Sequence, residues 1–181
     1  MNIEYADKKN LPYYFISDII SENIQGLEEL LKLTEYFTVK DINMGIKSRS
    51  KNEVLAEMAG FFCSRNNIAD STAILDIIMQ RERVQSTGIG CGIAIPHGKT
   101  DRIDRVKLSV GLIREGIEFS SLDKKPAHLI FLVISPESEH YIYLSILAKI
   151  SRLFQSGALL GGIIKNASTA EDVFRLIQAE D

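Results

Sequence analysis

The chain has 181 residues, of which 45% are apolar, and its formal net charge is −3. This length and apolar content suffice for one well-formed core, so we expect a single globular domain with a short attachment. Nucleic acid and anionic membrane surfaces attract basic patches, which disfavours both as main partners of an acidic chain. Small molecules or other proteins are the expected partners.

The sequence carries no sign of a membrane span or a signal peptide. No apolar run approaches the ~18 residues that a transmembrane helix needs, and the first residues lack the charged and apolar regions of a leader. Cys63 and Cys91 stand in contexts unlike a disulfide framework or a paired metal motif, which suits a reducing compartment. We therefore expect a soluble, cytoplasmic protein without direct membrane insertion.

Residues 1–35 form a segment with its own apolar pattern. Its apolar residues recur at helical spacing, namely Ile16, Ile19, Ile20, Ile24, Leu27, Leu30 and Leu31. We expect an N-terminal helical extension here. It either packs on the domain as an extra helix, or holds a homo-oligomer together or covers a docking face.

The next elements alternate between a strand and two helices. Residues 36–42 predict a strand. Ser50 and Glu53 have the spacing of a capping box that opens a helix ending near Asn66. Asp70 or Ser71 is the expected cap of a second helix, which carries Arg81 and Glu82 in its final turn.

The second half of the chain predicts a sheet core. Residues 93–95 are a short buried strand, and residues 106–112 and 127–135 are rich in β-forming residues, the latter long enough to be a central strand. Helices are expected over residues 139–154 and, from a capping box at residues 168–171, over residues 169–179. Strands interleaved with helices predict an α/β layer fold.

The segment Ser86-Thr87-Gly88-Ile89-Gly90-Cys91-Gly92-Ile93-Ala94-Ile95-Pro96-His97-Gly98 is the most informative part of the chain. Three glycines at alternate positions adopt backbone angles closed to other residues, so their N–H groups are able to converge on an anion. Pro96 fixes one dihedral before His97, and Gly98 leaves its far side uncrowded. We expect a phosphate-binding loop beside an oriented histidine.

A longer pattern contains this segment and resembles the signature of a known family. It is an acidic or amide residue followed at fixed spacing by aliphatic-Ala-aliphatic-Pro-His-small, filled here by Glu82, Ile89, Gly90, Ile93, Ala94, Ile95, Pro96, His97 and Gly98. The chain thereby resembles the enzyme IIA proteins of the fructose, mannitol and nitrogen-regulatory branch of the bacterial phosphotransferase system. The resemblance covers residues 36–181 and implies the mannitol-type IIA fold, a single α/β domain with a mixed central β-sheet flanked by helices.

The resemblance also implies an activity. In this family the histidine matching His97 takes a phosphoryl group from the phosphocarrier HPr and passes it to a IIB partner, which makes the chain a phosphotransferase. His140 matches a second histidine thought to lie beside the first and to bind phosphate oxygens. Since the donor bond is already activated, neither ATP nor a metal nor another cofactor is implied.

The residues themselves suggest how such a site works. A histidine with its usual pKa of ~6.5 is neutral near pH 7, as a nitrogen nucleophile must be. Arg81 and a phosphate loop of Thr87, Gly88, Gly90 and Gly92 are expected to surround the phosphoryl group. Glu82 or Glu139 is expected to orient an imidazole or to anchor Arg81.

Each of these residues also has a purely structural interpretation. Arg81 near a helix C-terminus complements the helix dipole, and His140 suits an exposed first turn. For His128, at the head of an apolar strand, the structural role is favoured. A zinc site of Cys91, His97 and His140 is disfavoured, because the spacing fits no usual zinc motif.

Two functions remain open at this point. One is a step of carbohydrate uptake, in which a separate IIB protein passes the phosphoryl group to sugar. The other is a regulatory protein of the nitrogen-related branch, which binds targets according to its phosphorylation state. Either requires an accessible apolar surface around His97, to which Ile89 and Ile103 are expected to contribute.

Overall fold

The computed structural model describes residues 31–181. The helix expected over residues 1–35 and its role in assembly fall mainly on residues 1–30, outside the described residues, and stay predictions. Within the described part, residues Leu33–Glu35 form a 3-10 helix, η1, and Leu33 is fully buried. No helix in residues 31–181 has the length and apolarity to cross a membrane.

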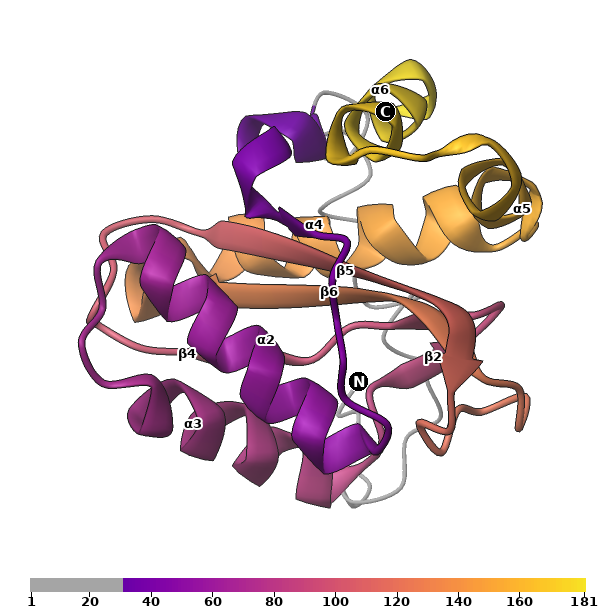
Figure 1. The fold of residues 1–181 in the computed structure, drawn as a ribbon. Helices are drawn as coiled ribbons and strands as arrows, with labels where there is room; N and C mark the ends of the chain where they lie inside the picture. Colours follow the sequence, from indigo (N-terminus) through magenta and orange to yellow (C-terminus); the bar gives the residue numbers. More distant parts are fainter. Residues whose placement is uncertain (1–30) are drawn as a thin grey trace, which may run out of the picture.

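A mixed six-stranded sheet forms the centre of the molecule (Figure 1). Its strands in spatial order are β1 (Ile42–Asn43), β5 (Lys107–Ile117), β6 (Ala127–Ser135), β3 (Ile93–Ala94) and β2 (Gly88–Gly90), while β4 (His97–Lys99) also pairs with β6. Strand β5 runs antiparallel to β6, whereas β3 and β4 run parallel to it. The expected mixed α/β architecture is thus confirmed.

Helices cover both faces of this sheet, as Figure 1 shows. One face carries α2 (Lys51–Asn66) and α3 (Ser71–Val84); the other carries α4 (His140–Phe154), α5 (Ala158–Asn166) and α6 (Ala170–Glu180). Short 3-10 turns, η2 (Val39–Asp41) and η3 (Glu137–Glu139), precede β1 and α4. The sheet is therefore the middle of three layers.

Strand β6 shows why this layering follows from the sequence. Leu129, Phe131 and Val133 pack into the cluster below α4–α6, and the residues between them pack against α2 and α3. Successive strand side chains point to opposite faces, so an unbroken apolar run is buried on both. The central strand predicted at residues 127–135 has these bounds.

The helix starts on the α2–α3 face follow local signals. The Ser50 side chain accepts a hydrogen bond from the Glu53 N–H in a complete capping box, and α2 ends at Asn66 with Asn67 in the left-handed conformation. The Asp70 carboxylate accepts from the Ala73 N–H and caps α3. Both expectations are confirmed.

Three expectations need correction. The strand predicted over residues 36–42 shrinks to the two-residue β1, because the Thr38 N–H and hydroxyl both donate to Asp41 and close the turn η2 instead. The capping box expected at residues 168–171 is formed one residue later by Thr169 and Asp172. Helix α5 was not expected at all.

The carboxylate of Asp181 ties the two ends of the described chain together. It accepts hydrogen bonds from the Leu33 and Thr34 N–H groups at 2.9 and 3.0 Å, lies 3.8 Å from Lys149 Nζ, and its side chain is 1% exposed. Removing it leaves buried donors unpaired, so Asp181→Ala should lower the free energy of unfolding by about 2–4 kcal/mol in urea titrations. A loss no larger than that of Glu180→Ala, an exposed neighbour, would contradict this role.

Candidate functional site

His97 is the first residue of β4, and both of its ring nitrogens have fixed neighbours. Nδ1 lies 2.6 Å from the Ile95 carbonyl oxygen, an atom that only accepts, so Nδ1 must carry the proton. The Arg81 Nε–H donates to Nε2 at 2.9 Å, so Nε2 must carry the lone pair. Both contacts select the same tautomer and leave Nε2 as the nucleophilic atom.

The surroundings of His97 keep its imidazole neutral. Burial, the largest cause, lowers its pKa to about 4; the positive charge of Arg81 acts in the same direction, while the Ile95 hydrogen bond and Glu82 oppose it. At pH 7 the ring is therefore unprotonated at Nε2. The neutral imidazole that a nitrogen nucleophile requires is therefore present, with a pKa further below 7 than the usual value.

The lowered pKa of His97 has a consequence for stability. An unfolded histidine protonates near pH 6.5, whereas His97 in the folded chain resists protonation down to about pH 4, so the unfolded state binds more protons between these values. The contribution is complete above pH 6.5 and is lost as pH falls towards 4, to a total of roughly 3 kcal/mol. The difference between wild type and His97→Gln in urea titrations at several pH values measures it; a difference independent of pH would refute it.

Arg81 reaches His97 because α3 packs closely on β4. It lies in the last turn of α3, and its Nη1 donates to the Gln85 carbonyl at 3.0 Å. A Cβ at Gly98 would collide with Ile77 of α3, so glycine at this position permits the close approach. The expected delivery of Arg81 to the start of the glycine segment is found, and with it a direct contact to His97.

Two further side chains at the site were not anticipated. The ring of Tyr143, in the first turn of α4, meets the His97 ring edge-on with centroids 5.8 Å apart. Lys99 Nζ lies 5.8 Å from the centre of the same tyrosine ring and 2.8 Å from Glu137. The sequence contains a signal for each of them. Lys99 follows His97 by two residues, so the alternation of strand side chains places both on one face. Tyr143 follows His140 by three residues, which places it one helical turn later.

Glu82 does not orient an imidazole or anchor Arg81, contrary to expectation. Its carboxylate accepts from the Thr87 N–H and hydroxyl and forms an ion pair with Lys51 Nζ at 2.5 Å, with 6% of the Glu82 side chain exposed. Lys51 also donates to the Phe119 carbonyl at 2.8 Å. Glu82 therefore fixes the turn before β2, and the Ile95 carbonyl selects the tautomer of His97.

Glu139 is likewise engaged elsewhere, since its carboxylate accepts from the Val106 N–H at 2.6 Å. His140 is exposed, and its ring lies 5.9 Å from that of Tyr141. It precedes Tyr143 by three residues, and residues three apart share a helix face, so His140 stands one turn from the ring that contacts His97. Its direct role at the site stays a prediction.

The glycine segment is a β-hairpin rather than a loop around His97. Gly90, Cys91 and Gly92 all have positive φ at the tip between β2 and β3, and the Cys91 N–H donates to the Asp123 carboxylate at 3.0 Å. Strand β3 pairs with β6 at Leu129 but β4 pairs with it at Val133, which places the tip about 13 Å along the strand from His97.

Two of the N–H groups expected to bind phosphate have acceptors within the chain. Those of Thr87 and Gly88 donate to Glu82 and to the Ser86 hydroxyl. The glycines serve packing instead, because a Cβ at Gly88 would lie 2.7 Å from the Ser121 hydroxyl and one at Gly92 would collide with Leu160. The expected phosphate loop of Thr87, Gly88, Gly90 and Gly92 is corrected accordingly.

His128 has the structural role that the sequence favoured. Its Nδ1 lies 3.2 and 3.1 Å from the carbonyl oxygens of Ile113 and Arg114, where the register between β5 and β6 shifts. Cys91 is exposed at the hairpin tip. Within residues 31–181, no three histidine, cysteine or carboxylate side chains are grouped as a metal site would require.

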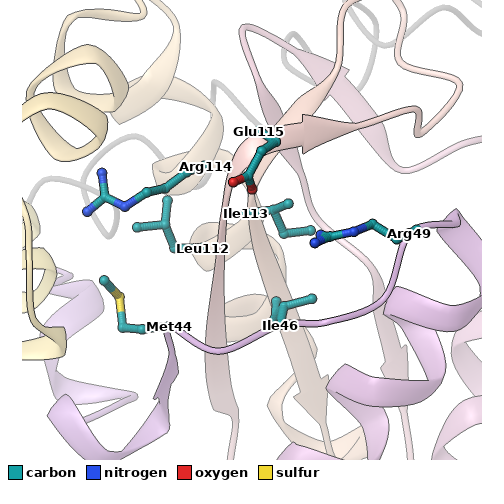
Figure 2. Close-up of a pocket in the computed structure, with 7 residues that line it drawn as sticks. All are labelled: Met44, Ile46, Arg49, Leu112, Ile113, Arg114 and Glu115. Carbon is teal, nitrogen blue, oxygen red and sulfur yellow. The ribbon is translucent and has the colours of Figure 1, made fainter.

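A surface pocket of about 230 Å³ lies at the β5 edge, beyond the point where β1 stops pairing (Figure 2). Its lining comes from the β1–α2 connection and from β5, and consists of Met44, Ile46, Arg49, Leu112, Ile113, Arg114 and Glu115. Figure 2 shows Arg114 extending away from Arg49, and its guanidinium donates to the Ile164 and Ala167 carbonyls at the end of α5. The pocket contains none of the predicted site residues.

The geometry of His97 and Arg81 can now be compared with known proteins. The family described as "Phosphoenolpyruvate-dependent sugar phosphotransferase system, EIIA 2" matches residues 35–180. The chain belongs to this family. The match spans the three-layered domain, including His97 on β4, and confirms the resemblance noted from the signature.

Two relatives of the chain differ in the length that it covers. The chain is 31% identical over 151 residues to the PTS system fructose-specific EIIABC component of Bacillus subtilis, covering 83% of this chain but only 24% of that protein. It is 30% identical over 125 residues to a nitrogen regulatory protein of Bradyrhizobium diazoefficiens, covering 69% of this chain and 81% of the relative. The chain thus spans about a quarter of the fructose-specific relative and most of the regulatory one.

Solved EIIA structures share the fold. Nitrogen regulatory protein IIA-Ntr from Neisseria meningitidis superposes with a TM-score of 0.73 at 26% identity, over 80% of this chain and 98% of its own. Mannitol IIA from Escherichia coli, solved in complex with phosphorylated mannitol IIB, gives a TM-score of 0.64 at 17% identity, over 79% of this chain and 97% of its own. The mixed α/β fold expected from the sequence is that of these proteins.

Proposed function

We propose that this EIIA 2 protein is a phosphocarrier that accepts a phosphoryl group from phosphorylated HPr on Nε2 of His97 and passes it to a IIB component in carbohydrate uptake. The single observation that carries the proposal is the fixed tautomer of His97, with the proton on Nδ1 and the lone pair of Nε2 facing Arg81. A merely structural histidine has no need of a cation at its unprotonated nitrogen.

The tautomer makes the transfer simple in both directions. The donor N–P bond breaks with its electron pair leaving on the donor, and the lone pair of Nε2 forms the new N–P bond. The Ile95 carbonyl holds the proton on Nδ1 throughout, so the phosphorylated ring is a good leaving group. On onward transfer the pair returns to Nε2 and the original neutral ring reappears, without any proton moved on this chain.

Arg81 supplies the charge that the phosphoryl group requires. Its guanidinium is already at Nε2, so when phosphorus takes that position the arginine N–H groups lie beside the phosphoryl oxygens. The activated donor leaves little further chemistry to catalyse, so positioning and charge stabilisation dominate. We also propose that His140, one turn from Tyr143, contributes a further donor to those oxygens.

Docking of HPr and IIB requires exposed apolar side chains near the site. Val84 is 81% exposed and lies one turn after Arg81 on α3, and Tyr141 is 69% exposed beside His140 on α4. We propose that these two flank the docking surface. Ile103 is buried in the core, so it does not have the role expected from the sequence, whereas Ile89 is half-buried and its contribution to the docking surface stays a prediction.

The proposal is tested by incubating the protein with enzyme I, HPr and phosphoenolpyruvate and measuring its intact mass. One acid-labile phosphoryl group is expected. Absence of phosphorylation in well-folded protein, with HPr itself phosphorylated in the same mixture, would reject the carrier role. Addition of a IIB component should then remove the group.

A second function is favoured by the regulatory relatives, one of which is matched over 81% of its length. In this alternative, phosphorylation of His97 changes the affinity for a target protein without sugar transport, because about two negative charges appear beside Arg81. Pull-downs with unphosphorylated and phosphorylated protein distinguish the two. A non-transport target retained by one state only favours regulation, whereas transfer to a IIB component favours uptake.

A further inference from the structure

Tyr143 is buried against the face of His97. It lies in the first turn of α4 and is 8% exposed, and its ring meets the imidazole at 67° with centroids 5.8 Å apart. Edge-to-face contacts of this kind are favoured by the charge distribution of aromatic rings and restrict the orientation of both rings. The imidazole thus has a third neighbour besides those at its two nitrogens.

The tyrosine ring is itself held in place by β4. His97 and Lys99 are two residues apart on this strand and therefore share one face. Lys99 Nζ stands 5.8 Å from the ring centre and is anchored at 2.8 Å by Glu137. The ring of Tyr143 consequently fills the space between β4 and α4, with His97 and Lys99 both against it.

This third contact differs from the other two in what happens during phosphoryl transfer. The Arg81 contact occupies Nε2 itself and must give way when phosphorus arrives, which leaves only the Ile95 hydrogen bond at the nitrogens. A single hydrogen bond permits the ring to pivot about it. The contact with Tyr143 is made between the two rings and is not a hydrogen bond to Nε2, so displacing Arg81 from Nε2 does not require this contact to break.

We propose that Tyr143 is a positioning residue, whose ring holds the His97 imidazole in the orientation that directs Nε2 towards the phosphoryl group. This inference rests on the proposed function and adds a residue to its site. The Tyr143 side chain acts through His97 and needs no contact with phosphate. Its aromatic ring, rather than its hydroxyl, is the part that matters.

The charged neighbours are consistent with this role. The charges of Arg81 and Glu137 act on the tyrosine hydroxyl, Lys99 Nζ stands over its ring, and the charge of Glu82 acts on His97. Burial raises the pKa of Tyr143 to about 12, so the hydroxyl is neutral at pH 7. The ring therefore excludes water from the imidazole without adding a charge beside Nε2.

Two substitutions separate the ring from the hydroxyl and from bulk. Tyr143→Phe keeps the ring, and Tyr143→Leu keeps an apolar side chain without it. In NMR spectra of the unphosphorylated protein, Tyr143→Phe should preserve the single tautomer and the low pKa of His97. Tyr143→Leu should raise that pKa by about half a unit or more towards 6.5, because water then reaches the imidazole.

A matched control comes from a second edge-to-face pair in the same core. Phe37 and Phe174 have centroids 5.5 Å apart at 71°, away from the site, so Phe174→Leu removes a similar contact and should leave the His97 resonances unchanged. The proposal is overturned if Tyr143→Leu leaves the pKa of His97 as in wild type, or if Phe174→Leu shifts it equally.

Kinetics link the inference to transfer. With phosphorylated HPr as donor, Tyr143→Leu should lower kcat about tenfold with little change in KM, because orientation rather than docking is lost. Tyr143→Phe should stay within about twofold of wild type. Unchanged kcat in Tyr143→Leu would overturn the role in transfer. If wild type accepts no phosphoryl group, the proposed function fails, while the NMR comparison still decides whether Tyr143 positions His97.

Discussion

His97→Ala should take up no phosphoryl group from phosphorylated HPr, whereas the wild-type protein takes up one. The variant lacks the only nitrogen nucleophile that the described residues place against Arg81. This nitrogen, Nε2, carries a lone pair because the Ile95 carbonyl holds the ring proton on Nδ1. Because the new bond to phosphorus forms at Nε2 itself, we expect complete loss rather than a slower rate. Intact mass under neutral or alkaline conditions, which preserve phosphohistidine, measures it.

Two controls make this result specific. His97→Ala should retain its cooperative unfolding transition, which shows that loss of labelling is not loss of fold. His128→Gln removes the imidazole that lies near the Ile113 and Arg114 carbonyls and should still be labelled, because that ring has a structural place at the shifted register. Full labelling of His97→Ala would move the phosphorylation site elsewhere and contradict the proposed function.

Arg81→Ala should slow phosphoryl acceptance by about 100-fold or more, because it removes the cation at the position where charge gathers in transfer. Arg81→Lys should recover part of this rate, since an ammonium supplies the charge without the planar pair of donors. The pKa of His97 should rise in Arg81→Ala, because the positive charge that disfavours imidazolium is gone. Single-turnover labelling by phosphorylated HPr and NMR titration measure the two effects.

Arg83→Ala is the matched control for Arg81. Arg83 lies in the same last turn of α3 and is exposed, so its replacement by alanine removes the same charge from the protein. If loss of Arg81 acted only through the overall charge of the protein, both variants would slow the reaction alike. Equal rates in the two variants would therefore remove Arg81 from the site.

The parts of the fold that the sequence predicted well have local causes. The capping box at Ser50 and the carboxylate cap at Asp70 mark helix starts through contacts within one turn, and the apolar run of β6 marks a central strand by itself. Helix α5 has no such signal. Its two adjacent glycines oppose helix formation, and burial of Leu160 and Ile163 against the sheet overrides them.

The residues of the candidate site also differ in whether local sequence or tertiary contacts determine their roles. His97 and Arg81 followed from a signature and a helix end, both readable along the chain. The roles of Glu82 and the glycines did not, because they depend on partners that fold in from elsewhere: Lys51 on α2 for Glu82, and Asp123 and Leu160 for the hairpin. Spacing identifies which residues are near in sequence, but the assignment of hydrogen-bond acceptors is decided by tertiary contacts.

Strand β6 pairs along one edge with two short strands in succession, β3 and β4, which are separated only by Ile95 and Pro96. Ile93 and His97 are four residues apart, and so are their partners on β6, Leu129 and Val133. The connection therefore has the length that keeps β3 and β4 in register with β6. Strand side chains alternate between faces, which means that one inserted or deleted residue here would turn His97 from the face it shares with Lys99 to the opposite face of the sheet. The number of residues between Ala94 and His97 is therefore constrained as strictly as the identity of the histidine itself. Substitutions in this connection are compatible with the site, whereas insertions and deletions are not.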